Sequence, residues 1–427
     1  MYGLVVSTVF LLLYLAGLDS YGAPYLAPFA PLVRSDLKDA LIRKPLGVLD
    51  TRPQSYPNVN RIRRKPSRQF SVLAFTAAIA VKMFMLPSLL VAEAGRNGYI
   101  WMLVYVAIDL AALALIAVAA VKAKRSFYEL TESVLGRIGA RVLLVLCAAY
   151  ILFKMTLMLS EVNVFFSEAM YENFSWPVYL IPLLAVLAYA AARSPRVVGR
   201  TAEITLPFVA ASMLLLFVLS ATKPDYANLL PVLRESRGAV FDYTLWLGDF
   251  SPLAVFIGKI ERKKRTGTKL MLAGLAAGLA VVAFTVILSA EYGNISGLIE
   301  YGHNLGGLPT HSGSQNFSRL DLLVFAVWMT AVFLKLMLYL YAFVRHVLFV
   351  LRLNTPAAAY VVSALAVAAV YALSVFVFPT QAAVYGAATG AVLRLLALPE
   401  QIGIPVVAVT AALVKHVRER RRTHDQS

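Results

Sequence analysis

A single cysteine and a shortage of charge exclude two classes of protein at the outset. The one cysteine, Cys147, lies inside an apolar run, so no intramolecular disulfide can form and no thiolate cluster can hold a metal. Charged residues make up 15% of the 427 residues, whereas an ordinary soluble domain carries about 25%. Hydrophobic residues make up 60%. The composition therefore predicts a chain that lies mostly in lipid.

Signatures of catalysis and of nucleotide binding are also missing. The sequence has no phosphate-binding loop, no dinucleotide fingerprint and no Ser/His/Asp arrangement in a context that would support one. Two histidines, His303 and His311, share a Gly-rich stretch, but without a third ligand they fit loop residues better than a metal site. The sequence predicts no enzyme, no cofactor and no metal.

Long apolar runs are what the chain has in abundance. A bilayer core of about 30 Å requires about 20 apolar residues per helical crossing, and continuous runs favour helices over the alternating strands of a barrel. The first run has no basic residue before it and no small-residue cleavage site after it, so we expect it to be retained. The sequence predicts an all-α polytopic membrane protein of ten helices, plus one extra N-terminal transmembrane helix. The runs lie near 2–18, 70–92, 99–121, 142–166, 177–193, 203–221, 244–258, 269–290, 321–350, 357–378 and 391–415.

The net charge of +17 follows from where the basic residues lie. Within the ten-helix unit, the loops on one side carry 26 lysines and arginines, and the loops on the other side carry 6. Cytoplasmic loops hold the basic excess in membrane proteins, so both ends of the unit are predicted to be cytoplasmic. The basic run 418–422 is interpreted as an anchor beside lipid headgroups. A nucleic-acid partner is not expected.

Two of the ten predicted helices contain helix-breaking residues near mid-span. The first, AVKMFMLPSLL, holds Lys82 and Pro87. The sixth, LWLGDFSPLAVFIG, holds Gly248, Asp249 and Ser251 ahead of a proline. Either proline alone is consistent with a kink, but interruptions five helices apart are typical of transporters with two inverted five-helix repeats. We expect this 5+5 inverted-repeat permease fold, with broken helices 1 and 6 and the ligand site between them.

Three lysines lie near the centres of predicted helices. Each costs about 2.5–3.5 kcal/mol to insert into a bilayer, so we expect acidic partners or a hydrated cavity. A purely structural ion pair is the alternative for each lysine. The predicted charge network is Lys82, Asp109, Lys154, Glu161, Asp249 and Lys335. The predicted ligand site is Lys82, Met83, Phe84, Glu161, Gly248, Asp249, Phe250, Ser251, Lys335 and Tyr339.

An ordered series of segments resembles a known family. The series runs from Pro66 to Arg422 and includes LPSLLVAEAGRNGYIW, SFYELTESVLGRIG, GRTAEITLPF and LDLLVFAVWMTAVFLKLMLYLYAF. It resembles the spore germination permease family, the B subunits of germinant receptors, within the amino acid, polyamine and organocation superfamily. The resemblance implies a permease-like fold that binds a small germinant, often an amino acid. It also implies the A and C subunits as partners, and the inner membrane of the bacterial spore as the location.

Several positions match the pattern of that family residue by residue. Asp249 follows Gly248 where the family usually has Glu after Gly. Lys82 departs from the pattern, which has small residues in that part of helix one. The positions with like residues in the family are Glu161, Glu203, Trp328 and Lys335.

The first 67 residues resemble a different subunit. The stretch LDSYGAPYLAPFAPLVRSDLKDALIRKPLGVLDTRP looks like the C-terminal tail of the receptor A subunit. We therefore expect residues 1–67 to form an extra transmembrane helix with a cytoplasmic linker, and residues 68–427 to form the permease-like domain with its basic cytoplasmic C-terminus. An in-frame fusion and a fragment of a longer fused protein both fit this arrangement.

Three functions are consistent with the sequence. In a receptor, a small amino-acid-like ligand would lie between the broken helices, with its ammonium near Asp249 and its carboxylate near Lys82 or the amides that begin helix six. The alternative is an amino acid or amine transporter coupled to protons through Lys82 or Lys335. In a third interpretation the chain is a structural scaffold, and substitutions in the cavity leave the germinant response unchanged.

Overall fold

The computed structural model describes residues 67–80, 82, 86–123, 125–169, 176–220, 224–230, 246–260, 265–292 and 320–424. All of them belong to the second of two compact units, Lys65–Ser427. The extra helix predicted over residues 2–18 lies outside the described residues.

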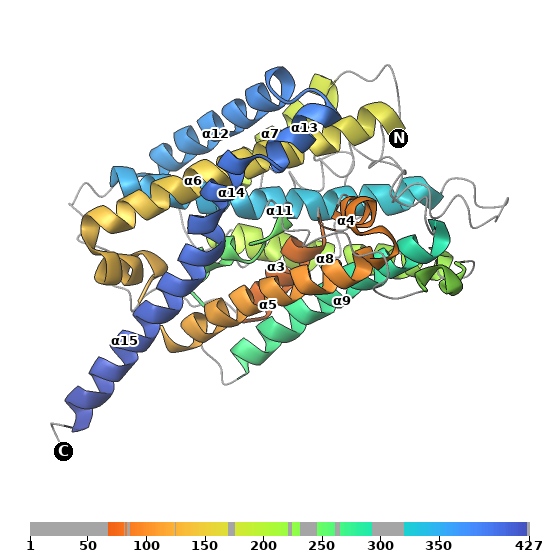
Figure 1. Cartoon of the computed structure of the whole chain (residues 1–427). Coiled ribbons are helices and arrows are strands. Elements are labelled where there is room, and N and C mark those ends of the chain that lie inside the picture. Colours follow the sequence, from red (N-terminus) through yellow and green to blue (C-terminus); the bar gives the residue numbers. More distant parts are fainter. Residues whose placement is uncertain are drawn as a thin grey trace, which may run out of the picture. The chain divides into compact units, whose positions relative to one another are not determined.

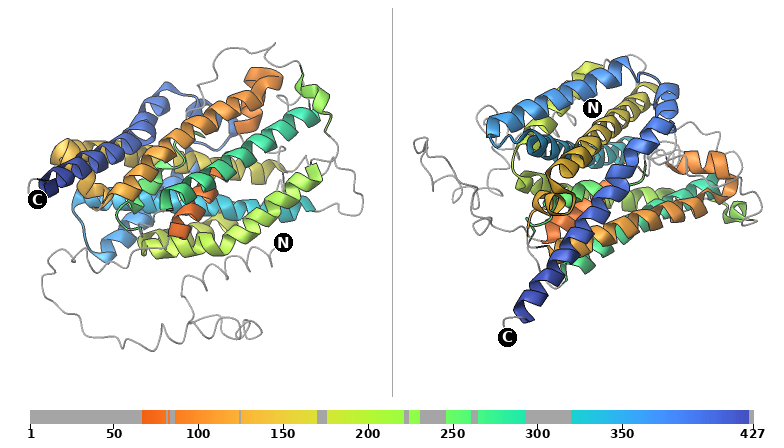
Figure 2. Two further views of the ribbon diagram at one scale, coloured as in Figure 1. Left: turned by 90° about the horizontal axis from the view of Figure 1, so that it is seen from below. Right: turned by 60° about the vertical axis from the view of Figure 1, so that its left-hand side comes forward.

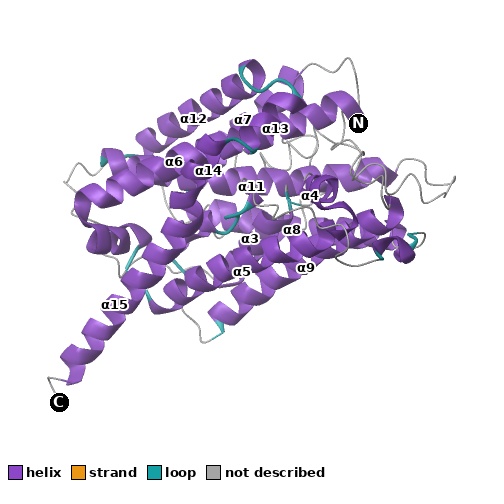
Figure 3. Cartoon of the chain, in the orientation of Figure 1, coloured by secondary structure: helices purple, strands orange, loops and turns teal. Residues whose placement is uncertain are grey.

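Helices form every element over the described ranges (Figure 3). In chain order they are α3 (Ser67–Ile79), α4 (Leu86–Ala94), η3 (Gly95–Asn97), α5 (Gly98–Lys122), α6 (Phe127–Ala169), α7 (Trp176–Ala192), α8 (Pro195–Ser220), η4 (Tyr226–Leu229), η6 (Ser251–Phe256), α9 (Thr266–Tyr292), α11 (Leu320–Leu351), α12 (Pro356–Phe376), α13 (Gln381–Ala388), α14 (Ala391–Leu398), η9 (Pro399–Gly403) and α15 (Ile404–His424).

Seven helices among the described residues are long and apolar enough to cross a membrane, which confirms the prediction of a multi-pass membrane protein. Three of the ten predicted crossings are not among the seven. The run 70–92 is divided between α3 and α4, and the run 177–193 forms the 17-residue α7. The described part of the run 244–258 contains the six-residue 3₁₀ helix η6. The seven are Gly98–Lys122, Phe127–Asn163, Pro195–Leu215, Thr266–Glu291, Met329–Leu351, Pro356–Phe376 and Ala391–Val414.

The long helix α11 runs through the middle of the bundle (Figures 1 and 2). It packs against α6, α7 and α12 on one side and against α3 and α8 on the other. The helices α3 and α5 both pack along α9, and the last crossing, α14 to α15, lies against α5 and α6. Because α11 contacts both groups of helices, a buried side chain near its centre is placed to meet residues from several elements.

Local sequence explains where several of these helices turn or begin. The element α6 changes direction at Gly136, whose φ of 69° lies in the left-handed region that glycine adopts without strain. The helix α12 begins after Thr355, whose hydroxyl accepts a hydrogen bond from the backbone N–H of Ala358 at 3.2 Å. Pro356 occupies the first turn, where its missing N–H leaves no bond unmade.

Candidate functional site

Two segments depart from regular α-helix near the centre of the bundle. The helix α3 ends at Ile79 and α4 begins at Leu86, with Lys82 in a turn between them. The segment 246–260 contains only the short 3₁₀ helix η6, which starts at Ser251 with Pro252 in its first turn. A 3₁₀ helix is short and its backbone hydrogen bonds have poorer geometry than those of an α-helix, so main-chain groups at its ends remain for other partners.

Gly248 permits a close approach between this segment and the last crossing. Its φ is 75°, and a Cβ added there would lie 2.4 Å from Cγ of Gln401. Residues with a Cβ rarely adopt this φ, and no side chain would fit between the two segments. Glycine is therefore required here by both conformation and space.

Asp249 is the centre of a buried ion cluster, with partners on two helices, α6 and α11, and in the turn after α3. Its Oδ1 atom lies 2.7 Å from Nζ of Lys335 on α11 and 3.2 Å from Nζ of Lys154 on α6. Its Oδ2 atom lies 3.2 Å from Nζ of Lys82. The Tyr339 hydroxyl donates a hydrogen bond to Oδ1 at 3.3 Å. The side chains of the three lysines are at most 3% exposed, and that of Asp249 is fully buried.

A second carboxylate extends the cluster to α5. Asp109 pairs with Lys82, and its Oδ1 accepts a hydrogen bond from the backbone N–H of Gly248 at 2.9 Å. In their charged forms the three lysines and two aspartates leave one unit of positive charge. We call this set of five residues, Lys82, Asp109, Lys154, Asp249 and Lys335, the lysine cluster.

The backbone beside Asp249 is held from two further elements. The carbonyl of Leu247 accepts a hydrogen bond from Lys154 Nζ at 2.9 Å and another from Gln401 Nε2 at 3.1 Å. Gln401 lies in the π-helical turn η9 and also donates to the Tyr150 hydroxyl of α6 at 2.9 Å. Sequence reasoning missed Gln401 and Tyr150. The signal available was a pair of polar residues, PEQ, within an otherwise apolar crossing.

Glu161 is buried as deeply as the cluster but is not bonded to it. The residue is 2% exposed, and over the described part of the chain neither of its carboxylate oxygens has a hydrogen-bond partner. Phe250 is also buried, but its ring lies against Gly274 of α9. Ser251 is fully buried, and its hydroxyl has no partner among the described residues.

The structure thus brings together most, but not all, of the predicted site. Met83 and Phe84 lie outside the described residues, as does the side chain of Trp328. Glu203 lies elsewhere: it pairs with Arg68 at 3.0 Å and accepts a hydrogen bond from Gln69 at 2.9 Å. The predicted residues that meet at the lysine cluster are Lys82, Asp109, Lys154, Gly248, Asp249, Lys335 and Tyr339.

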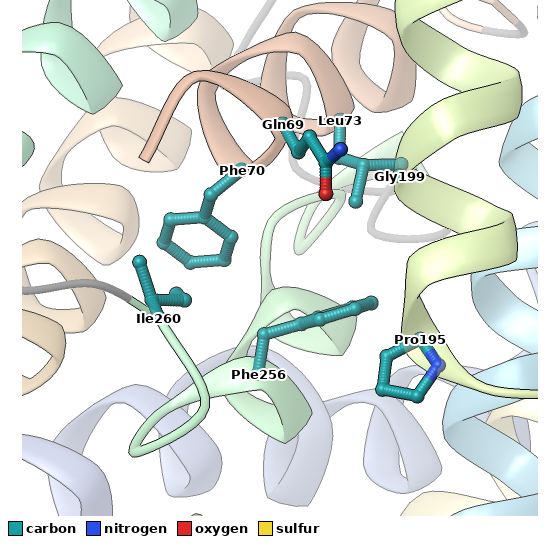
Figure 4. Close-up of a pocket in the computed structure, with 7 residues that line it drawn as sticks. All are labelled: Gln69, Phe70, Leu73, Pro195, Gly199, Phe256 and Ile260. Carbon is teal, nitrogen blue, oxygen red and sulfur yellow. The ribbon is translucent and has the colours of Figure 1, made fainter. Parts of the chain in front are cut away.

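A small pocket lies between α3, α8 and η6 (Figure 4). Its cavity volume is about 10 Å³, and Gln69 supplies the one polar side chain of its lining. None of the residues of the lysine cluster belongs to the lining, so this pocket is separate from the charged site. The lining residues are Gln69, Phe70, Leu73, Pro195, Gly199, Phe256 and Ile260.

Comparison with known proteins gives two family matches that together span most of the chain. The spore permease family, described as "Spore germination protein", matches residues 66–381. The family described as "Bacillus/Clostridium GerA spore germination protein" matches residues 1–55. These matches agree with the resemblance read from the sequence, including its different N-terminal part.

Two proteins of Bacillus subtilis (strain 168) are similar over short stretches. Spore germination protein KA is 35% identical over 63 residues, 15% of this chain and 12% of that protein. The uncharacterized membrane protein YfkQ is 36% identical over 59 residues, 14% of this chain and 12% of that protein. The chain therefore spans about an eighth of the length of the curated relatives it matches.

Among solved structures, the chain is similar to a Na⁺-coupled sialic acid symporter in a substrate-bound, outward-open state. The TM-score is 0.57, and the match covers 97% of this chain and 94% of that one. The sequences are 12% identical. At this identity the likeness concerns the fold, and it shows that the helices are arranged as in a transporter.

Proposed function

Because the chain belongs to the spore permease family of spore germination proteins, we propose that it is the permease-like subunit of a spore nutrient receptor. In this role it binds a small amino-acid-like ligand between its helices and signals to partner subunits. The family match and the transporter-like fold support this function. The match of residues 1–55 to the GerA family supports A and C subunits as partners and the inner membrane of the spore as the location.

The proposed architecture is the ten-helix fold of two inverted five-helix repeats, with both ends of the ten-helix unit in the cytoplasm. Two observations support it: the gap between α3 and α4 at Lys82, and the 3₁₀ segment that follows Asp249. The first corresponds to a broken helix 1 and the second to a broken helix 6. Transporters with this design bind their substrates where two such helices meet.

The lysine cluster is the observation that carries the proposal. Charged side chains inside a membrane protein are costly and mark functional sites by default. Here three ammonium groups converge on Asp249, and each comes from a different element. A ligand carboxylate that draws one lysine away from Asp249 would loosen the segment 246–251 relative to α6 or α11. The resulting shift between two conformations is the signal that partner subunits read.

A binding screen on the purified full-length chain tests this function. The thermal midpoint of the chain in detergent would be measured with each of the twenty standard L-amino acids. A ligand that binds the folded chain raises the midpoint. We expect at least one amino acid to stabilise the parent, and this effect to be lost in Lys335→Met. The matched control is Glu203→Gln, a change in an ion pair away from the cluster. If none of the twenty stabilises the parent, the proposal of an amino-acid-like ligand is wrong.

Proton-coupled transport of an amino acid or amine is the second candidate function, and the likeness to a symporter favours it. Lys82 or Lys335 would then carry the coupled proton. Uptake of labelled amino acids into proteoliposomes that contain this chain alone distinguishes the two functions. Accumulation driven by a pH gradient would support transport, and binding without accumulation would support the receptor.

A further inference from the structure

Glu161 lies on the same face of α6 as Lys154. The two residues are seven positions apart, and seven residues make almost two full turns of an α-helix. Glu161 is therefore about 10 Å farther along α6 from the cluster, in the direction of the C-terminal end of that helix. Because Lys154 points to Asp249 between α6 and α11, Glu161 is directed into the same helical interface.

A buried carboxylate without a partner is an unstable arrangement. Buried charges in proteins are normally paired, and an unpaired one costs several kcal/mol. Glu161 is 2% exposed and accepts no hydrogen bond from the described residues. Its neighbour Ser160 shares a hydrogen bond with Ser374 of α12 at 2.9 Å. The protein therefore provides an acceptor that its own described side chains do not use.

The acidic groups of the lysine cluster are already occupied. Both oxygens of Asp249 lie within 3.2 Å of lysine ammonium groups, and Asp109 is bound to Lys82 and to the backbone of Gly248. The cluster also carries one excess positive charge, whereas Glu161 is negative when ionised. Along α6 there is thus a positive region and, farther along, a carboxyl group that has no hydrogen-bond partner among the described residues.

We propose that Glu161, and not Asp249, receives the ammonium group of the ligand, while the carboxylate of the ligand faces the lysine cluster. This inference rests on the proposed function, since it assigns the two ends of an amino-acid-like ligand. It identifies the ligand class as small molecules with a cationic amine, for which Glu161 is a specificity-determining residue. An amino acid can pair its ammonium group with Glu161 and its carboxylate with the lysine cluster. A simple carboxylic acid can pair only with the lysine cluster.

The test compares Glu161→Gln with the parent in the purified full-length chain. For each standard L-amino acid that binds the parent, the 2-hydroxy acid of the same side chain serves as a probe without the ammonium group. We expect Glu161→Gln to weaken binding of the amino acid by about tenfold or more, as for loss of a hydrogen bond to a charged group. Binding of the hydroxy acid should change by less than about twofold. Glu161→Asp keeps the charge and should retain the preference for the amine.

Glu400→Gln is the matched control. Glu400 is fully buried on η9 and undergoes the same chemical change, but it lies on a different element. Parental binding of the amino acid by Glu161→Gln would overturn the inference and leave the proposed function standing. Equal weakening in the Glu161 and Glu400 variants would also overturn it, because the effect would not be specific to the position. If no amino acid binds the parent, the proposed function fails and the inference fails with it.

Discussion

Asp249 and Glu161 are carboxylates buried in one helical bundle with opposite surroundings. Asp249 lies among three ammonium groups and a tyrosine hydroxyl. Glu161 has no hydrogen-bond partner among the described residues. A carboxylate paired in this way holds helices together, whereas one without a partner can still accept a hydrogen bond from a ligand. In our proposal, Asp249 holds the three lysines in place and Glu161 is the carboxylate that receives the ammonium group of the ligand.

Asp249→Asn is expected to lower the free energy of unfolding the most. The substitution leaves three ammonium groups with one carboxylate, and breaking a buried ion pair by removing one partner costs about 3–5 kcal/mol. Glu161→Gln removes no hydrogen bond from the described residues and relieves the cost of an unpaired buried charge, so it should leave the free energy of unfolding unchanged or raise it. Denaturant unfolding of the two purified variants in detergent measures both values. Equal losses would mean that Glu161 is as firmly paired as Asp249.

Gly248→Ala should have the next largest effect. The added methyl group would meet Gln401 Cγ and would force a φ of 75° on a residue with a Cβ, a strain of about 2–3 kcal/mol. Gly386 on α13 has nothing within 4 Å of an added Cβ. There, Gly386→Ala should stabilise the helix by about 0.5–1 kcal/mol. Thermal midpoints that move in opposite directions would locate the strain at Gly248, and two equal shifts would contradict it.

Lys335→Met should cost less than Asp249→Asn, although both remove one charge from the same pair. The lysine cluster has one ammonium in excess, and Asp249 keeps Lys82 and Lys154 as partners after the change. We expect a loss of about 1.5 kcal/mol, the low end for a hydrogen bond to a charged group. Unfolding of the variant, measured beside Asp249→Asn, gives the comparison. A greater loss for Lys335→Met would show that the excess charge is compensated elsewhere.

Much of this arrangement follows from the sequence, because lipid imposes simple rules. Apolar runs of about 20 residues and the alternating basic loops predict the helices, and seven of the predicted spans appear among the described residues. The few acidic residues within apolar runs include Asp109 and Asp249, so the partners of the lysines could be foreseen as a group. Which acid binds which lysine depends on helix packing, which no local pattern contains.

Other features had at most a weak signal in the sequence. The run 391–415 was interpreted as one plain helix, so the π-helical turn that directs Gln401 toward Leu247 was not predicted. That Glu161 has no hydrogen-bond partner among the described residues could not be predicted either. Spacing along α6 places Glu161 and Lys154 on the same face of the helix. It does not show whether a side chain from another helix lies close enough to pair with Glu161.

Gln401→Leu tests the contact between the last crossing and the backbone beside Asp249. We expect it to change the free energy of unfolding the least. The change removes the hydrogen bonds from Gln401 to the Leu247 carbonyl and to Tyr150, but Lys154 continues to donate to that carbonyl. Because the Leu247 carbonyl stays bonded to Lys154, the net loss is mainly the bond to Tyr150, and the free energy of unfolding should fall by about 1 kcal/mol.

Gln69→Leu is the matched control, because Gln69 is also buried and donates one hydrogen bond, to Glu203 away from the cluster. The two variants should lose similar stability in denaturant unfolding. Only Gln401→Leu should also weaken binding of an amino acid, because it loosens the backbone that positions Asp249 among its lysines. If both variants bind the amino acid as the parent does, the hydrogen bond from Gln401 to the Leu247 carbonyl stabilises the fold without affecting binding. Lys154 alone would then position this backbone for the ligand.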